Sequence, residues 1–121
     1  MQIKSMDPIT LKKRLEEGSA VLIDVREPHE HAREHIEGAK LVPLSRLEAE
    51  KFAGLQDETA VFHCHSGGRT SANAKLLNSK GFRDAYHLGG GIVAWKAAGL
   101  PTRLQQQQPA GEGRRKLFGL F

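Results

Sequence analysis

Cys64 is the only cysteine among the 121 residues, and it opens the sequence Cys-His-Ser-Gly-Gly-Arg at residues 64–69. Thiolate, not thiol, is the nucleophilic form, and a helix N-terminus or a neighbouring cation lowers a cysteine pKa from roughly 8.5 to about 3.5–7.5. Gly67 and Gly68 let a loop approach a ligand closely, and Arg69 carries a donor fork suited to an oxyanion. These residue types favour a cysteine nucleophile facing an anion. The alternative is a small buried hydrophobe at a strand end, which is common for free cysteines.

The segments that flank this loop indicate how it is positioned. Residues 60–62 are short, apolar and partly β-branched, as in a buried strand, while residues 70–80 carry alanine and leucine side chains at helical spacing. The loop therefore joins a strand to a helix N-terminus, where backbone amides favour negative charge. We expect these amides and Cys64 to form one anion-binding site.

Alternating helices and strands are predicted along the rest of the chain. Asp7 and Gly18 are suited to begin and end a helix over residues 8–17. The other predicted elements are a strand at 21–25, a helix at 44–52, a strand at 85–88 and a helix at 92–98. This order predicts an α/β fold with a central parallel sheet and helices on both faces. Ligands of such sheets sit beyond the carboxyl ends of the strands, where Cys64 lies.

Several separated motifs resemble the single-domain rhodaneses. The loop reads Cys-x-x-Gly-x-Arg-Thr at residues 64–70, the active-site pattern of that family. The other matching segments are Leu-Ile-Asp-Val-Arg-Glu at 22–27 with Glu30, His-Ile-Glu-Gly-Ala at 35–39, Val-Pro-Leu at 42–44, Leu-Gly-Gly-Gly-Ile-x-x-Trp at 88–95 and Gly-Leu-Pro at 99–101. The resemblance covers about residues 4–102, with Glu34 and Glu37 replacing the usual glycine and proline. It implies the rhodanese-like fold.

The resemblance also implies a sulfurtransferase. Cys64 would take a sulfane sulfur from thiosulfate or a related donor, hold it as a persulfide and pass it to cyanide, a thiol or a protein thiol. The residues implied to bind the persulfide and the donor anion are His65, Ser66, Gly67, Gly68 and Arg69. This chemistry needs a nucleophile and a stabilised anion, so we expect no metal and no organic cofactor. With no second cysteine, the sulfur must be discharged to another molecule.

Two other functions remain as alternatives. Cysteine phosphatases and arsenate reductases also place a cysteine and an arginine around an anion-binding loop, but their pattern has five intervening residues. This chain has only residues 65–68 between Cys64 and Arg69. The second alternative is a non-catalytic rhodanese-like binding or regulatory module. Such modules generally lack the cysteine, which this chain retains.

The remaining polar side chains are interpreted mainly as structural. By the resemblance, Asp24 and Arg26 brace loops. His29, His31 and His35 are predicted to lie in a surface turn, although the last two have metal-ligand spacing on a helix. His63 and His65 flank Cys64, but neighbouring strand residues point to opposite faces, which disfavours a shared zinc site. We expect His65 at the mouth of the pocket or in contact with an acceptor. Trp95 and Phe82 are interpreted as core residues.

Composition and charge suit a cytoplasmic domain. One cysteine forms no internal disulfide, and the N-terminus lacks the apolar region of a secretory signal. The net charge is +4, and its excess lies mainly in residues 103–121, so no nucleic-acid partner is predicted. We divide the chain into a rhodanese domain at 1–103 and a Gln/Gly/Pro-rich linker with a basic and then apolar tail at 104–121. We expect a disordered end. The alternatives are weak membrane or partner docking through the tail, or a tail that leads to a membrane segment.

Overall fold

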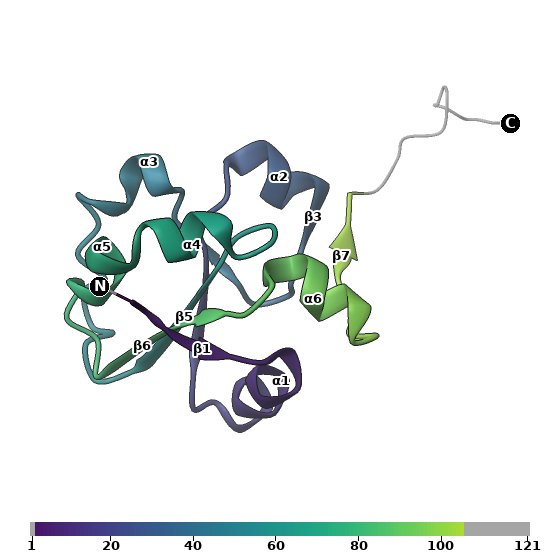
Figure 1. Cartoon of the computed structure of the whole chain (residues 1–121), viewed down its shortest axis with the longest axis horizontal. Coiled ribbons are helices and arrows are strands. Elements are labelled where there is room, and N and C mark those ends of the chain that lie inside the picture. The colour runs from purple at the N-terminus through teal and green to yellow at the C-terminus, as the bar shows by residue number, and fades with distance from the viewer. Residues whose placement is uncertain (1, 106–121) are drawn as a thin grey trace, which may run out of the picture.

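A computed structural model describes residues 2–105 and shows a five-stranded sheet with strand order β1-β6-β5-β2-β4 (Figure 1). The strands are β1 (Lys4–Met6), β2 (Val21–Asp24), β4 (Lys40–Leu41), β5 (Thr59–His63) and β6 (Asp84–Leu88). Every neighbouring pair in this sheet is parallel. β5 lies at the centre with all of its residues buried. A strand buried on both faces reads as a continuous apolar run, which explains why its sequence predicted it.

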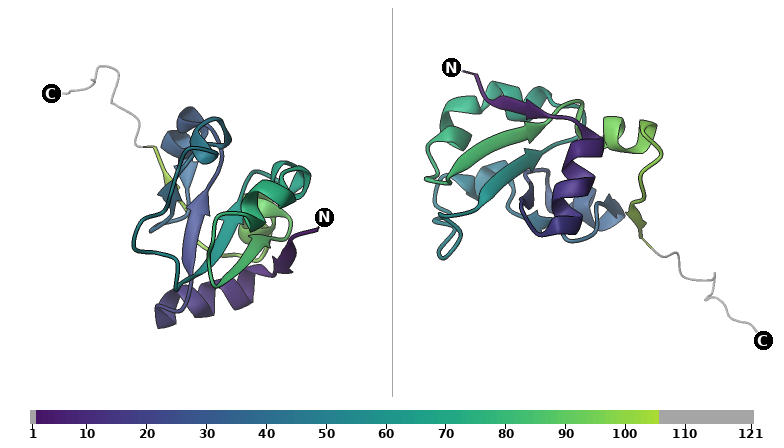
Figure 2. Two further views of the ribbon diagram at one scale, coloured as in Figure 1. Left: turned by 90° about the vertical axis from the view of Figure 1, so that its left-hand side faces the viewer. Right: turned by 90° about the horizontal axis from the view of Figure 1, so that it is seen from below.

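Helices cover both faces of the sheet, as predicted. They are α1 (Pro8–Glu17), α2 (Pro28–Arg33), α3 (Leu44–Leu47), α4 (Gly68–Ala72), α5 (Ala74–Asn78) and α6 (Gly91–Ala97). One buried cluster joins the sheet to Leu47 of α3 and Leu77 of α5. A second cluster on the opposite face includes Leu11 of α1 and Trp95 of α6. Figures 1 and 2 show α1 on one side of the sheet and α4 and α5 on the other.

Alternation along β5 decides which way the candidate site faces. Ala60 and Phe62 belong to the cluster beneath α3 and α5, whereas Val61 belongs to the cluster beneath α1 and α6. Successive strand side chains point to opposite faces. Cys64, directly after β5, accordingly joins the Phe62 side, and His63 points to the other side.

Helix α1 has the bounds that the sequence predicted, residues 8–17. Asp7 caps the helix through a hydrogen bond from the Thr10 amide. Gly18 ends it in the left-handed region at φ 71°, a conformation that glycine adopts without a steric cost. Strands β2, β5 and β6 and helix α6 also agree with their predicted positions within a residue or two.

Two predicted helices are wrong in extent. The helix expected over residues 44–52 ends at Leu47, and Phe52 lies outside it, with a φ of 49° and a side chain that is buried to 1% exposure. The helix expected over residues 70–80 is two short helices that meet at Asn73 (φ −112°, ψ 24°). The Asn73 side chain donates to the carbonyl of Arg69. Side-chain bonds of this kind compete with regular helix bonding.

Several elements were not predicted. Residues 28–33 form helix α2 rather than the surface turn expected around His29 and His31, so that expectation is wrong. β3 (Glu34–His35) pairs antiparallel with β7 (Arg103–Leu104). The proposed boundary between residues 103 and 104 therefore falls inside a strand. The tail from residue 106 onward lies outside the described residues, as do the predictions about it. Within residues 2–105, no helix has the length and apolar character needed to cross a membrane.

Candidate active site

Cys64 occupies the junction between β5 and α4, as the sequence predicted. The thiol is buried, with 1% of the residue exposed. The amide of Gly67 donates a hydrogen bond to Cys64 Sγ over 3.1 Å. Gly67 adopts φ 99° as the residue before α4, a conformation that turns its amide back to the thiol at no steric cost. The local geometry therefore provides a donor aimed at the sulfur.

Thr70 of α4 lies near the sulfur and is itself in contact with His87 of β6. Thr70 Oγ1 lies 3.8 Å from Cys64 Sγ, donates to the carbonyl of Gly67 at 3.1 Å and lies 2.6 Å from His87 Nδ1. Sequence reasoning noted Thr70 only as part of the motif and missed His87. The available signal was weak, since His87 is a single histidine in an apolar strand.

The loop that begins at Cys64 rests on the start of α6. The amides of Ile92 and Val93 donate to the carbonyls of Cys64 and His65 at 3.0 and 3.1 Å. Gly91 makes this approach possible, because a Cβ there would collide with the His65 carbonyl and lie 2.6 Å from the Cys64 carbonyl oxygen. Its φ of +62° also disfavours other residues. The glycine-rich segment thus fixes the backbone of the active-site loop.

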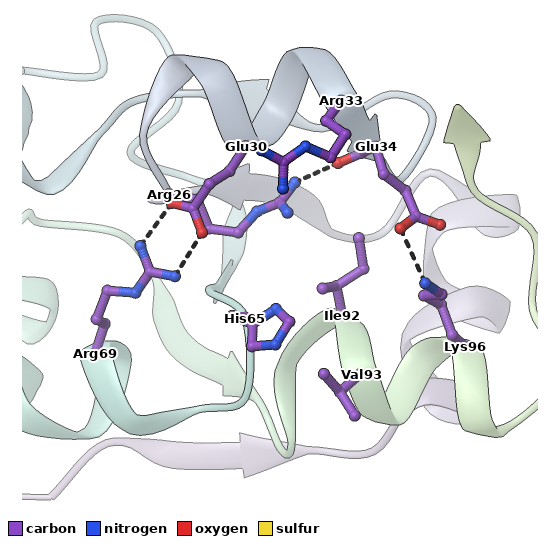
Figure 3. Close-up of a pocket in the computed structure, with 9 residues that line it drawn as sticks. All are labelled: Arg26, Glu30, Arg33, Glu34, His65, Arg69, Ile92, Val93 and Lys96. Carbon is purple, nitrogen blue, oxygen red and sulfur yellow. Dashed lines mark hydrogen bonds and ion pairs between the residues drawn. The ribbon is translucent and has the colours of Figure 1, made fainter. Parts of the chain in front are cut away.

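Arg69 is held by an acidic partner. Its guanidinium donates to both carboxylate oxygens of Glu30 on α2, at 2.8 and 2.9 Å (Figure 3). This hydrogen bonding lowers the pKa of Glu30 to about 2 and raises the pKa of Arg69. Glu30 Oε1 also accepts from the Glu27 amide at the start of α2. The predicted cation is present, and its charge is already balanced by Glu30, which sequence reasoning named only as part of a motif.

A pocket of about 500 Å³ lies beside the loop (Figure 3). It is lined by Arg26, Glu30, Arg33, Glu34, His65, Arg69, Ile92, Val93 and Lys96. Lys96 forms an ion pair with Glu34 at 2.9 Å, whereas no ion pair within the described residues involves the exposed Arg33. The lining carries more basic than acidic side chains, which suits an anionic ligand.

The predicted site residues occupy three kinds of position. His65 and Arg69 line the pocket. Ser66 and Gly68 are exposed on the loop but do not line the pocket. Cys64 and Gly67 are buried and do not line the pocket. All of the predicted residues belong to one continuous turn, so the structure brings them together.

A buried polar network centred on Asp24 lies next to the pocket, whose lining includes Arg26. Arg26 donates to both carboxylate oxygens of Asp24 at 3.0 and 2.8 Å, and His31 Nδ1 lies 2.9 Å from Asp24 Oδ2. Burial raises the pKa of Asp24, but hydrogen bonds from Arg26 outweigh this effect and lower it to about 2. The rings of His31 and His35 stack at 4.3 Å. Asp24 and Arg26 therefore stabilise the loops next to the pocket.

His63 belongs to this network and not to the thiol site. It is fully buried, and its Nε2 lies 3.7 Å from Asp24 Oδ2 with no hydrogen-bond partner. Burial lowers the pKa of His63 to about 4, although the charge of Asp24 opposes this. Within residues 2–105, no three histidine, cysteine or acidic side chains are grouped so that they could hold a metal ion.

Comparisons with known proteins agree with this arrangement. The family model described as "Rhodanese-like domain" matches residues 7–98. An uncharacterized protein of Synechocystis sp. is 39% identical over 102 residues, which are 84% of this chain and 57% of that protein. The thiosulfate sulfurtransferase GlpE of Pseudomonas fluorescens is 32% identical over 95 residues, covering 78% of this chain and 86% of GlpE. The solution structure of a rhodanese-like domain from Anabaena sp. has a TM-score of 0.73 and 30% identity, covering 100% of this chain and 95% of that one.

Proposed function

This chain belongs to the rhodanese-like domain family, and we propose that it is a sulfurtransferase that carries a sulfane sulfur on Cys64. The observation that carries the proposal is the 3.1 Å hydrogen bond from the Gly67 amide to Cys64 Sγ. A donor already aimed at the sulfur stabilises the thiolate that must attack. The thiosulfate sulfurtransferase GlpE aligns over most of its length, which supports the same reaction type here.

The proposed reaction has two half-reactions. The Cys64 thiolate attacks the outer sulfur of thiosulfate, the S–S bond of the donor breaks, and sulfite leaves with the bonding electron pair. A nucleophilic acceptor, cyanide or a thiolate, then attacks the outer sulfur of the persulfide and regenerates the Cys64 thiolate. No net oxidation of the protein occurs, and ping-pong kinetics are expected.

The loop offers further donors for the transferred sulfur. Within residues 2–105, the amides of Ser66, Gly68 and Arg69 have no backbone acceptor. Unsatisfied amides at the start of a helix are suited to bind an anion. We propose that these amides, with Gly67, hold the outer sulfur of the persulfide and the charge of the leaving group. His65 stands at the exposed side of the pocket, where an acceptor would enter.

Burial of Cys64 restricts the access of a sulfur donor to Sγ. Cys64 is 1% exposed and does not line the pocket. We propose that the exposed side chains of His65 and Ser66 move to admit the donor, while the loop backbone stays in place, and that the basic side chains of the pocket attract the donor. We propose the cytoplasm as the location, since a reduced lone thiol is maintained there.

Intact-mass measurement of the full chain after incubation with thiosulfate tests the proposal. The expected result is a gain of one sulfur atom by the parent, its loss after cyanide or a thiol is added, and no gain by Cys64→Ser. Ser71→Ala, on the exposed side of α4, is the matched control and should gain sulfur like the parent. A parent chain that takes up no sulfur from thiosulfate or from any other sulfane donor would exclude the persulfide mechanism.

A cysteine phosphatase is the competing enzyme, and an aryl phosphate distinguishes it. Only residues 65–68 separate Cys64 from Arg69, which gives a smaller cradle than a phosphoryl group needs. Hydrolysis of the aryl phosphate without sulfur uptake would reverse the assignment. A chain that performs neither reaction would instead favour a binding module.

A further inference from the structure

Thr70 has one hydroxyl proton and more than one acceptor for it. Its Oγ1 lies 3.1 Å from the Gly67 carbonyl, 2.6 Å from His87 Nδ1 and 3.8 Å from Cys64 Sγ. A hydroxyl donates once and accepts twice, and a neutral histidine carries its proton on either ring nitrogen. If Nδ1 is bare, Thr70 donates to His87. If Nδ1 carries a proton, His87 donates to Thr70, and the hydroxyl of Thr70 is free to donate to the Gly67 carbonyl or to Cys64 Sγ.

This group is closed off from bulk water on most sides. Thr70 is 0% exposed, Cys64 1% and His87 9%. Hydrogen bonds in such an environment are stronger than in water and respond to one another. His87 is the most exposed of the three residues.

Among the described residues, the strand neighbours and hydrogen-bond contacts of His87 lead to one ionisable group. Its register neighbours are Ser5 on β1 and Phe62 on β5, and α4 presents Thr70. None of these titrates near neutrality, so the ionisable group that His87 faces is Cys64, reached through Thr70. Burial lowers the pKa of His87. Burial therefore favours the neutral ring, in which one of the two nitrogens is bare.

We propose, resting on the sulfurtransferase function above, that His87 is a positioning residue that sets the protonation state of Cys64 through Thr70. In the tautomer with a bare Nδ1, the hydroxyl of Thr70 turns from the Gly67 carbonyl to His87. The thiol S–H bond then breaks as its proton passes to Thr70 Oγ1, while the hydroxyl proton of Thr70 passes to His87 Nδ1. The products are a thiolate and an imidazolium, and no co-reactant is consumed. The imidazolium then donates from Nδ1 to Thr70, whose hydroxyl turns to the sulfur. The thiolate is thus held by two donors, Gly67 N–H and Thr70 O–H.

The pH dependence of Cys64 alkylation by iodoacetamide tests this directly in the full chain, because no other cysteine reacts. His87→Asn keeps a hydrogen-bonding amide where Nδ1 lies but cannot take up a proton. Thr70→Val removes the hydroxyl, and Thr70→Ser restores it. We expect the alkylation rate at pH 7 to fall about tenfold in His87→Asn and in Thr70→Val, with the profile moved to higher pH. Thr70→Ser and the control His29→Asn, at an exposed position, should follow the parent.

A second measurement uses the intact His87. The ring titration of His87, followed by NMR, should shift between the parent and Cys64→Ser, because two groups that share a proton titrate as a pair. This readout remains valid if a His87 or Thr70 variant fails to fold. Coincident alkylation profiles for the parent, His87→Asn and Thr70→Val, or an unchanged His87 titration in Cys64→Ser, would overturn the relay.

These readouts do not depend on sulfur transfer. A parent chain that accepts no sulfur but alkylates as described would refute the proposed function and leave the relay in place. A chain that forms the persulfide, but whose alkylation is unchanged by the His87 and Thr70 substitutions, would support the proposed function and refute the relay.

Discussion

Arg69 and Glu30, 39 positions apart in the sequence, form a bidentate ion pair that connects the active-site loop to helix α2. Planar guanidinium and carboxylate groups that meet in this way gain geometric definition as well as charge attraction. The pair fixes Arg69 at the edge of the pocket and neutralises much of its charge. An incoming anion therefore meets an arginine that already has a partner.

Glu30→Gln should destabilise the fold in a pH-dependent way. The pKa of Glu30 falls from 4.5 to about 2 on folding, so its stabilisation is fully present above pH 4.5 and is lost as the pH falls toward 2. Both side chains are partly exposed, which limits the effect to about 1 kcal/mol at pH 7. Urea unfolding of parent and variant should show this gap at pH 7 and a shrinking gap below pH 4.5.

The exposed pair of Lys12 and Glu16 supplies the control for that experiment. Glu16→Gln should change the free energy of unfolding much less at pH 7, since exposed pairs contribute little. A gap between parent and Glu30→Gln that stays constant from pH 7 to pH 2 would show that the charge of Glu30 contributes nothing to stability.

Arg33 is the exposed pocket cation that should attract the donor over a distance. Arg33→Gln is expected to lower kcat/KM for thiosulfate by about two- to fivefold at low ionic strength, through a higher KM with kcat nearly unchanged. The loss should disappear at high salt, because exposed charges are screened. Arg46→Gln, on α3 and outside the pocket lining, is the control. An effect of Arg33→Gln that persists at high salt would contradict steering and indicate direct contact.

The difference between what the sequence predicted and what it did not follows from the range of the interactions. The active-site loop could be found because a glycine pair, an arginine and an apolar strand all lie within a few positions of Cys64. The Glu30 and His87 partners could not, because they come from α2 and β6 and meet the loop only in the folded chain. No local spacing encodes such pairs.

The same reasoning applies to the fold. β5 was predicted because it is buried on both faces, and α1 because it has a cap residue, a buried Leu11 and a terminal glycine. Helix α2 has no buried residue, so it leaves no apolar period in the sequence. The break at Asn73 depends on a side-chain bond that helical spacing does not show. Short strands such as β3 and β7 carry too few residues to form a pattern.

Gly91→Ala should be among the most harmful single changes to the fold. The new Cβ would collide with the His65 carbonyl, at a residue whose φ is +62°. A left-handed conformation costs an alanine about 1 kcal/mol, and overpacking adds about 1–3 kcal/mol. We expect a loss of about 2–4 kcal/mol in the free energy of unfolding, measured with urea.

Gly54→Ala separates the two contributions. Gly54 has φ +82° and nothing within 4 Å of an added Cβ, so it reports the conformational cost alone, about 1 kcal/mol. Equal losses for both variants would mean that the close approach between α6 and the active-site loop is unimportant to stability.

His63 should make the fold less stable in mild acid. Its pKa falls from 6.5 to about 4 in the folded chain because the ring is buried. The unfolded chain therefore takes up a proton near pH 6.5 that the folded chain resists, and stability decreases as the pH falls from 6.5 to 4. The shift corresponds to about 3 kcal/mol. His63→Phe keeps an aromatic ring that cannot be protonated and should remove most of this decrease in the free energy of unfolding, measured with urea at a series of pH values.

His29→Phe, at an exposed position, should retain the parent slope. Parallel curves for the parent and His63→Phe between pH 6.5 and 4 would show that His63 does not control acid stability.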